Sequence, residues 1–370
     1  MSFSFGFSSN DLSDDEIDGA SQLGNADSSK YAGVYRSGNP LDDERLKVST
    51  VVQPKLHELK DILTSLVNVR VSFEQFETPG RSTVLYRREL FDVKHQLMSE
   101  FDDSHSQNVE MDILMGETSE DLRKNVYEGG LKSWECSIDV VETLTENESL
   151  LADFDCILEL GCGTSLPSEH IFRRYLQGNF TTGLKLILSD YNESVLRLVT
   201  VPNMIVTWAK TVLSNQQWLE LQQSENNGEM PTQFDELLFT SKLLDAFFQD
   251  LQTKNISIVL ISGTWGRSFS QIIDSQISMN KGLLAITSET IYQPENLPVV
   301  AETLIEILLV KRPLSTKALV AAKDIYFGVG GSIVEFEKYL NEQITQRSLA
   351  LSFYTYKVNV GLRRSIVSIE

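Results

Sequence analysis

The sequence predicts an α/β fold in which helices cover both faces of a mainly parallel sheet. From residue 127 onward, short apolar runs alternate with helical patterns, as expected for parallel strands joined by helical crossovers. The run 156–160 leads into a glycine turn, and the run 184–189 ends at a carboxylate. The last two runs, 348–359 and 363–369, lie so close together that they must form an antiparallel hairpin.

Seven apolar runs are the candidate strands of this sheet. They are 156–160, 184–189, 256–262, 282–288, 316–323, 348–359 and 363–369. Helical patterns fall between most of them, and the clearest spans 297–312, where apolar residues recur at helical spacing. Asn296 precedes this helix as a cap, and Pro313 ends it. We therefore expect a parallel sheet with one antiparallel strand near an edge, unlike a nicotinamide-binding sheet, which is parallel throughout.

The composition is that of a globular protein with a substantial core. The chain has 370 residues, 41% of them hydrophobic, and no apolar run long enough to span a bilayer. Three cysteines without CxxC spacing indicate a reducing compartment, and four scattered histidines make a metal site unexpected. The net charge of −20 disfavours nucleic-acid binding. Solubility is the plainer reason for this charge, and attraction of a basic protein is the alternative.

Three regions follow from the composition along the chain. Residues 1–50 are rich in Ser, Asp, Gly and Asn and are expected to form a disordered acidic tail. Residues 51–126 mix short apolar patches with polar runs and are expected to form an N-terminal extension. Residues 127–370 carry the α/β pattern, with an insertion at about 211–250 whose second half is expected to be helical.

The turn Gly161-Cys162-Gly163 lets the backbone come close to a nucleoside cofactor. A dinucleotide fingerprint requires a small residue where Leu166 stands, because close helix packing brings the pyrophosphate to the turn. S-adenosylmethionine has no phosphate and does not need that packing. The turn therefore favours S-adenosylmethionine over a dinucleotide, with a plain strand-to-helix turn as the alternative.

A carboxylate, Asp190, ends the run after this turn and is followed by Tyr191 and Asn192. A carboxylate at this position can accept both ribose hydroxyls of a nucleoside. Nicotinamide cofactors also contain ribose, so Asp190 does not discriminate between the two cofactors. Asn192 is a candidate site residue, and capping the next helix is its commoner role.

An aromatic motif, Gly263-Thr264-Trp265, follows the run 256–262. Gly263 allows the backbone to approach an adenine, and Trp265 offers a flat apolar face. A core tryptophan without a ligand role is equally consistent with the pattern.

An acid and an aromatic hydroxyl follow the run 282–288, which ends at Ser288. Glu289 and Tyr292 stand at the carboxyl edge of the sheet, where ligands bind in open α/β sheets. In isolation, a helix-start acid and a half-buried tyrosine would explain them. Two glycine-containing segments, 127–137 and 323–332, are placed to fold over a ligand or a substrate.

Together these segments resemble a known family. Residues 127–370 are similar to a Rossmann-like, seven-stranded class I methyltransferase of methyltransferase family 16, with Glu289 and Tyr292 matching its acid-xx-aromatic signature. Tyr127–Cys136, Ser189–Asn192, Val201–Asn203, Ser288–Tyr292, Tyr326–Ser332 and the Phe-rich start Met1–Phe7 resemble the histidine protein methyltransferases. Asp324 stands where some members of that family carry His.

The resemblance implies an S-adenosyl-L-methionine-dependent enzyme that releases S-adenosyl-L-homocysteine and uses no metal. It implies methylation of one histidine, at the tele nitrogen, in the third large-subunit ribosomal protein (uL-three). With Gly163 added from the turn, the cofactor contacts are expected at Ser133, Trp134, Glu135, Cys136, Ser137, Gly161, Gly163, Asp190, Tyr191, Asn192, Gly263, Thr264, Trp265 and Ser288.

The acceptor imidazole must present the lone pair of one nitrogen while the other nitrogen holds the proton. A hydrogen-bond acceptor in the site can fix that tautomer. Glu289 is the first candidate, with Asn192 and Tyr292 as supporting catalytic residues. Histidine is mostly neutral at cellular pH, so a strong general base is less necessary than it is for lysine.

Several rival functions stay open from the sequence. A lysine protein methyltransferase would use the same fold, and a nicotinamide oxidoreductase would bind a dinucleotide. A non-catalytic chaperone or assembly factor would hold a basic ribosomal protein through the acidic tail. We expect a monomer in the cytoplasm and nucleus that supports ribosome biogenesis and translation, without membrane or specific nucleic-acid binding.

Overall fold

The computed structural model describes nine stretches of the chain. These are residues 38–48, 51–100, 129–178, 182–222, 235–277, 282–310, 315–326, 330–358 and 363–370. The chain divides into two units, Met1–Asn39 and Pro40–Glu370, and the second carries the fold. The predictions for most of the acidic tail, for the Phe-rich start, for Tyr127 and for residues 223–234 of the insertion lie outside the described residues.

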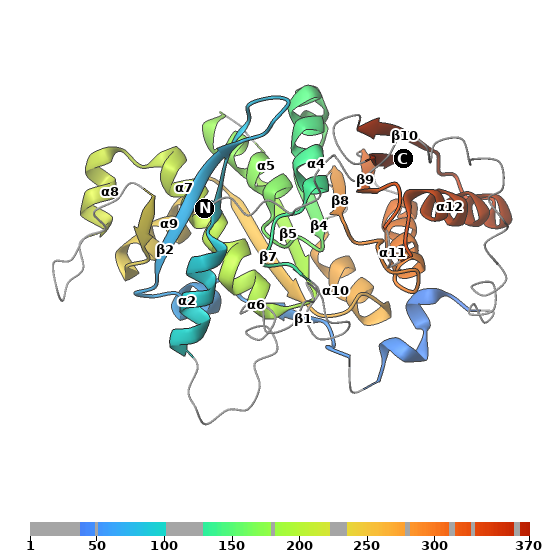
Figure 1. The fold of residues 1–370 in the computed structure, drawn as a ribbon, viewed down its shortest axis with the longest axis horizontal. Coiled ribbons are helices and arrows are strands. Elements are labelled where there is room, and N and C mark those ends of the chain that lie inside the picture. The colour runs from blue at the N-terminus through green and yellow to red at the C-terminus, as the bar shows by residue number, and fades with distance from the viewer. Residues whose placement is uncertain are drawn as a thin grey trace, which may run out of the picture. The chain divides into compact units, whose positions relative to one another are not determined.

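A mainly parallel sheet forms the centre of the second unit (Figure 1). Its order within the described residues is β1-β7-β5-β4-β8-β9-β11-β10. The strands are β1 (Lys55–His57), β4 (Cys156–Leu160), β5 (Leu184–Asp190), β7 (Ile256–Ser262), β8 (Leu283–Ser288), β9 (Thr316–Lys323), β10 (Phe353–Val358) and β11 (Arg364–Ile369).

The predicted fold class is confirmed, because each of the seven predicted runs forms a strand. β4, β5, β7, β8 and β9 are parallel, and β11 runs antiparallel to both β9 and β10. The eighth strand, β1, comes from the N-terminal extension and pairs antiparallel with β7. The sequence missed β1 because three residues carry too short a pattern to be detected.

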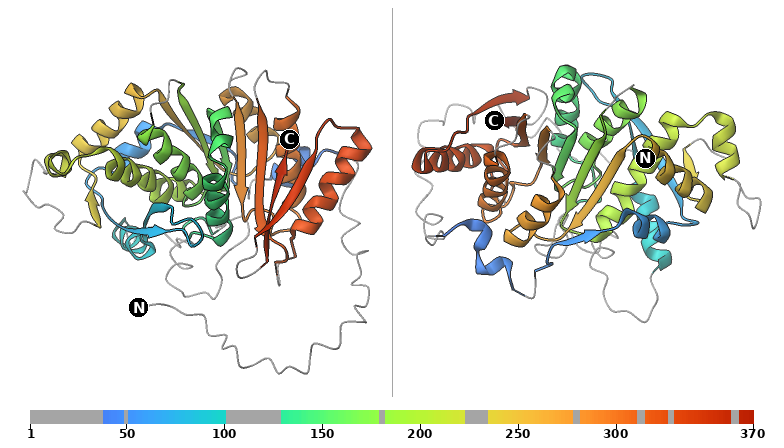
Figure 2. Two further views of the ribbon diagram at one scale, coloured as in Figure 1. Left: turned by 90° about the horizontal axis from the view of Figure 1, so that it is seen from above. Right: turned by 180° about the vertical axis from the view of Figure 1, so that it is seen from behind.

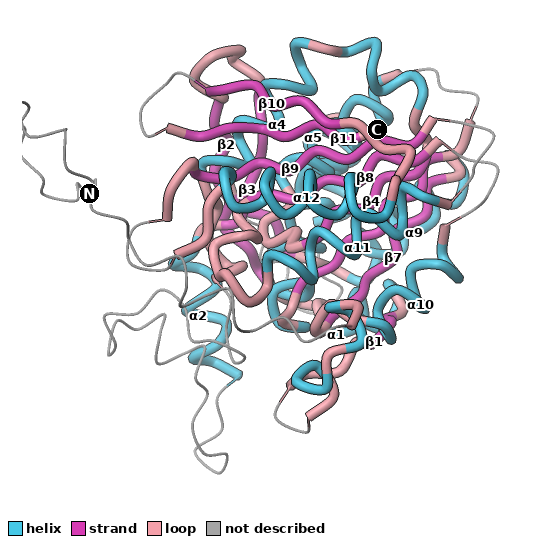
Figure 3. The backbone as a smooth tube through the Cα atoms, turned by 90° about the vertical axis from the view of Figure 1, so that its right-hand side faces the viewer, coloured by secondary structure: helices cyan, strands magenta, loops and turns pink. Residues whose placement is uncertain are grey.

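Helices cover the two faces of the sheet, as Figure 2 shows from above. One face is covered by α1 (Leu59–Ser65), α4 (Glu135–Glu146), α5 (Leu166–Gln177), α7 (Val201–Val212) and α9 (Ser241–Thr253). The other face is covered by α10 (Arg267–Gln276), α11 (Leu297–Leu309) and α12 (Ile333–Arg347). Figure 3 shows the strands running between these helices. No helix within the described ranges is both long and apolar enough to cross a membrane.

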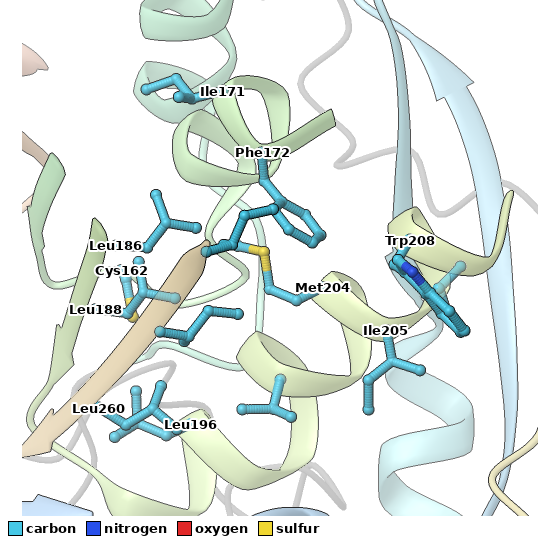
Figure 4. Packing of buried hydrophobic residues seen from close by; sticks show 14 of the residues in the cluster. Cys162, Ile171, Phe172, Leu186, Leu188, Leu196, Met204, Ile205, Trp208 and Leu260 are labelled. Carbon is cyan, nitrogen blue, oxygen red and sulfur yellow. The ribbon is translucent and has the colours of Figure 1, made fainter. Parts of the chain in front are cut away.

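The core on the first face consists of tightly interlocked apolar side chains (Figure 4). Leu186 and Leu188 of β5 contact this layer together with Phe172 of α5 and Met204 of α7, and all four are fully buried. Burial of each such side chain contributes about 1.5–3 kcal/mol to folding. This layer anchors the turn that joins β4 to α5, since Cys162 belongs to the same cluster.

The N-terminal extension and the insertion share a small second sheet of order β3-β2-β6. Its strands are β2 (Arg70–Glu77), β3 (Val84–Arg88) and β6 (Glu236–Leu238). The extension continues into α2 (Leu90–Glu100), and α8 (Asn215–Gln222) lies in the insertion. The helix expected in the second half of the insertion starts only at Ser241, because residues 236–238 pair with β2.

The predicted tail of residues 1–50 overlaps with the folded unit, which begins at Pro40. Two short 3-10 helices, Pro40–Asp42 and Glu44–Leu46, lie within it. Leu41 is buried, and the Arg267 guanidinium donates to Asp42 at 2.9 Å between Nε and Oδ1. One buried leucine and one ion pair are too small a signal to stand out from the polar composition around them.

Candidate active site

The predicted site residues follow the carboxyl ends of β4, β5, β7 and β8, which lie at one edge of the sheet. The chain passes from β4 outward through β5 to β7 and then crosses to β8 on the other side of β4. Open α/β sheets bind their ligands at such a reversal of strand order. The remaining elements of the site are α4 and the loop after β9.

The turn after β4 depends on its glycines. Gly161 has φ +65° and Gly163 has φ +50°, values that side chains rarely adopt. A Cβ on Gly161 would lie 2.5 Å from Cγ2 of Thr290, so the turn and the segment after β8 are in close contact. Leu166 begins α5 and is fully buried in a small cluster with Leu85 and Val141.

The Asp190 carboxylate is fixed against this turn. Gly163 donates its main-chain N–H to Asp190 Oδ2 at 2.9 Å, and Asn192 donates its N–H to Oδ1 at 3.2 Å. Asp190 is 5% exposed. A buried carboxylate at the tip of the neighbouring strand is the group that ribose recognition requires.

The segment before α4 packs directly on the turn, and its predicted contact with a ligand stays a prediction. A Cβ on Gly130 would lie 3.0 Å from Asp190 Oδ2, and one on Gly163 would lie 3.1 Å from the Gly130 carbonyl oxygen. The hydroxyls of Ser133 and Thr164 are 2.9 Å apart. Trp134 Nε1 donates to the Gly129 carbonyl at 3.2 Å, which fixes its ring at the start of α4.

Trp265 lies over the same turn. Its Nε1 donates to Ser189 Oγ at 3.3 Å, and its ring comes within 3.5 Å of where a Cβ of Gly161 would stand. It also packs against Phe269 on the second face of the sheet. Trp265 therefore contributes to the core and to the turn, and its predicted contact with a nucleoside stays a prediction.

Gly263 makes a close approach that sequence reasoning missed. Its φ is +102°, and a Cβ there would lie 2.5 Å from the Gln53 carbonyl oxygen. Thr264 donates its N–H to the Val52 carbonyl at 2.9 Å, and Val52 donates its own N–H to the Tyr191 hydroxyl at 3.3 Å. Gly263 thus permits a close approach to the segment leading into β1, and its predicted approach to an adenine stays a prediction.

Glu289 has the most unusual environment in the site. Its φ is +55°, and its N–H donates to the Ala321 carbonyl of β9 at 2.9 Å. The side chain is only 6% exposed. The Tyr326 hydroxyl donates to Oε2, while Oε1 is buried without a hydrogen-bond partner in the described residues. Glu159 Oε1 and Glu169 Oε2 are buried in the same way, so the catalytic role of Glu289 stays a prediction.

Tyr326 and Lys323 complete the surroundings of Glu289. Burial, followed by the charge of Glu289, raises the pKa of the Tyr326 hydroxyl far above its usual range, so this hydroxyl keeps its proton and stays a donor. Lys323 Nζ lies 3.8 Å from Glu289 Oε1. Burial raises the pKa of the Cys136 thiol, and the neighbouring Glu289 raises it further, which keeps this thiol neutral. The sequence missed Tyr326 and Lys323 as site residues, although both stand where β9 ends.

The predicted catalytic residues occupy two places. The Tyr292 ring lies 6.3 Å from that of Tyr326, and Gly331 donates its N–H to the Tyr292 carbonyl, so Tyr292 belongs with Glu289. Asn192 begins α6 (Glu193–Val195) after β5, on the opposite side of β4, and its side chain does not cap that helix. The strands β5 and β8 are about 10 Å apart. The catalytic role of Asn192 stays a prediction.

The other predicted residues are placed by the same elements. Glu135, Cys136 and Ser137 form the first turn of α4, and Ser288 ends β8. Among the described residues no three His, Cys, Asp or Glu side chains are grouped so that they could hold a metal ion. The absence of a metal from the reaction stays a prediction.

The chain has close relatives among characterised proteins. It is 52% identical to histidine protein methyltransferase 1 of Saccharomyces cerevisiae, over 100% of this chain and 98% of that protein. It is 34% identical to the protein of the same name from Schizosaccharomyces pombe, over 84% of this chain and 82% of that protein. No family model matches the chain.

Solved structures give weaker likenesses. Magnesium protoporphyrin IX methyltransferase from Synechocystis, solved with bound SAH, is 10% identical with a TM-score of 0.33, covering 75% of this chain and 93% of that one. An rRNA methylase from Streptococcus thermophilus is 11% identical with a TM-score of 0.31, covering 65% of this chain and 98% of that one. The assignment rests on the two yeast relatives. Because the identity to the first of them extends over the full length of this chain, this methyltransferase belongs to the family of histidine protein methyltransferases.

Proposed function

We propose that this enzyme transfers a methyl group from S-adenosyl-L-methionine to the tele nitrogen of a histidine in the third large-subunit ribosomal protein. The observation that carries this proposal is the pairing of two sites at one edge of the sheet. A glycine turn with a buried carboxylate lies at the ends of β4 and β5. A second buried carboxylate follows β8, and one of its two oxygens lacks a hydrogen-bond partner in the described residues. The first suits a nucleoside, and the second suits a neutral N–H donor.

The residues of the first site fit S-adenosylmethionine. Asp190 would take the ribose hydroxyls, the main chain at Gly161 and Gly163 would take the methionyl end, and Trp265 would lie by the adenosine. Positive φ at both glycines and the fixed carboxylate are the observations behind this fit. When bound, the cofactor supplies a methyl group on a sulfonium. Leu166, which fills the space a dinucleotide fingerprint leaves open, argues against NAD.

The second site fits a neutral imidazole. Glu289 Oε1 is buried and lacks a hydrogen-bond partner in the described residues, so it can accept the N–H of the imidazole nitrogen nearer the main chain. That hydrogen bond leaves the lone pair on the tele nitrogen. Tyr326 holds the other carboxylate oxygen, which keeps the acceptor in one orientation. The protein thus contributes positioning and tautomer selection, with no strong base required.

The choice of a ribosomal protein as substrate follows from the family resemblance and is consistent with the charge of the chain. The net charge of −20 suits association with a basic protein partner. The same proposal places the enzyme in the cytoplasm and nucleus as a monomer, acting in ribosome biogenesis and translation.

Mass spectrometry of ribosomal proteins from cells with and without the enzyme tests the target. We expect one methylated histidine in the third large-subunit protein to disappear when the enzyme is absent. An unchanged histidine methylation pattern would reject the target. Calorimetry with S-adenosylhomocysteine and with NAD tests the cofactor, and binding of NAD alone would reject S-adenosylmethionine.

Replacing the target histidine with Lys and with Gln separates histidine from lysine methylation. Methylation of the lysine version at the wild-type rate would favour the lysine methyltransferase instead. A purely non-catalytic assembly factor would bind the ribosomal protein and leave all three versions unmethylated.

A further inference from the structure

We propose that Lys323 makes the enzyme selective for histidine over lysine, by occupying with its own ammonium the place that a substrate lysine would need. This inference rests on the proposed function, because it concerns the acceptor side of the same site. Nothing in the assignment of the family identifies a residue for that choice. The structure supplies it through the side chains that surround Lys323.

Two aromatic rings and two carboxylates surround the Lys323 ammonium, and we call them the Lys323 cage. Nζ lies 5.6 Å from the centroid of the Trp134 ring and 6.0 Å from that of Tyr326. It lies 3.4 Å from Glu135 Oε2 and 3.8 Å from Glu289 Oε1. Aromatic faces combined with carboxylates are the arrangement by which proteins bind cationic amines. In this chain the cage is filled from within, by a side chain that is only 20% exposed.

The cage and the acceptor site share one atom. Glu289 Oε1 is the oxygen proposed to accept the imidazole N–H, and it is also the Glu289 oxygen that lies beside Lys323. At 3.8 Å, Lys323 is close enough to set the local charge but too far to satisfy that oxygen with a hydrogen bond. A neutral imidazole can therefore dock on Oε1 beside the lysine. A substrate ammonium would have to meet a like charge at the same place.

The same charge acts on the protonation state of the acceptor. A cation beside the docking oxygen disfavours imidazolium relative to neutral imidazole. Only the neutral form has a lone pair to attack the methyl group. Lys323 therefore excludes lysine and favours the reactive form of histidine through one interaction.

The test compares Lys323→Met with Lys317→Met. Lys317 lies at the other end of β9 in a similar setting, 2.6 Å from Glu370 Oε2 and 5.9 Å from the ring of Tyr354, and is 16% exposed. Both changes remove one ammonium and keep an unbranched apolar side chain. The probes are the third large-subunit ribosomal protein and the same protein with its target histidine replaced by lysine.

With Lys323→Met we expect the lysine version to compete at least about tenfold more strongly against methylation of the histidine protein, because the like charge is gone. With Lys317→Met we expect no change. Thermal melting and S-adenosylhomocysteine affinity confirm that each variant is folded. If Lys323→Met does not fold, Lys323→Gln is measured in its place. Unchanged competition in the folded variant would overturn the inference.

A second measurement does not depend on methylation. Lys323→Ala empties the cage, and tetramethylammonium, a permanent cation, should then bind to it, which NMR or calorimetry would detect. Wild type should show no such binding, and absence of binding to the folded variant would count against the cage. If the wild-type enzyme methylates no histidine in the ribosomal protein, the proposed function fails, whereas the cation measurement still decides on the cage.

Discussion

At the ends of β4, β5 and β7 the site is shaped mainly by the main chain, whereas at the ends of β8 and β9 it is shaped by side chains. On the first side, which we call the cofactor side, glycines adopt positive φ and main-chain N–H groups hold Asp190. On the second, the acceptor side, Glu289, Tyr326 and Lys323 hold one another across two strands. Under the proposed function, the cofactor side binds a constant ligand, and the acceptor side sets the charge of a variable one.

Gly161→Val tests whether the cofactor side depends on backbone geometry, and it should have the largest effect. Valine at φ +65° is strained, and its Cβ would overlap Thr290. We expect S-adenosylhomocysteine affinity to fall by about 100-fold or more, and the thermal midpoint to fall as well. Calorimetry and melting curves measure both. Gly38→Val is the control, since within the described part of the chain no atom lies within 4 Å of a Cβ at Gly38. Equal behaviour of the two variants would show that the turn geometry is unimportant.

Glu289→Gln tests the acceptor side. Glutamine keeps the shape but replaces the charged acceptor with an amide that can turn its NH₂ toward the imidazole. We expect kcat to fall by about 100-fold with S-adenosylhomocysteine affinity unchanged. Glu342→Gln, on the exposed surface of α12, should leave both unchanged. Wild-type turnover in Glu289→Gln would show that this carboxylate does not orient the acceptor.

A buried acid under the glycine turn gives the cofactor side a pH dependence of its own. Burial is the main reason that the pKa of Glu159 rises to about 7, despite hydrogen bonds from Ser165 and Ser168. The folded protein therefore binds more protons than the unfolded chain between about pH 4.5 and 7, so this group lowers stability as the pH rises through that window.

Glu159→Gln should remove this contribution. We compare the free energy of unfolding of the variant with that of wild type. We expect this difference to favour the variant more at pH 8 than at pH 5, by on the order of 2 kcal/mol. Urea unfolding at the two pH values measures the difference. A constant difference between variant and wild type across that range would show that Glu159 does not titrate there.

Tyr326→Phe should have the smallest effect of the four and identifies Tyr326 as a positioning residue. It removes the hydroxyl that donates to Glu289 Oε2 but keeps the ring beside Lys323. We expect kcat to fall about tenfold, the equivalent of one hydrogen bond to a charged group, with little change in KM. Tyr354→Phe, on the exposed face of β10, is the matched control. A loss confined to KM, or shared by the control, would contradict the assignment.

The cofactor side was largely predictable from the sequence, and the acceptor side only in part. Buried strands such as β4, with all five residues covered, leave continuous apolar runs, and turn glycines stand next to them. Glu289 was predicted as a site residue because it follows such a run. Its partner Lys323 lies 34 positions further along, and the two meet only because Ser288 of β8 pairs with Ala321 of β9. Register of this kind has no local signal in the sequence.

The extension was less predictable for a different reason. β1 has one buried residue of three, and its place is fixed by main-chain pairing with β7. Main-chain hydrogen bonds do not depend on residue type, so composition reveals little about them. The same holds for the contact of Gln53 with Gly263, which only the structure shows.

The pairing of β1 with β7 has a consequence for how the catalytic region can be handled. A chain cut at residue 127, where the methyltransferase pattern begins, would lose β1 and leave β7 as an open edge of the sheet. Its uncovered N–H and carbonyl groups would be a template for strands of other molecules, and self-association would compete with folding. By covering this edge, residues 51–57 of the N-terminal segment therefore protect the enzyme against aggregation.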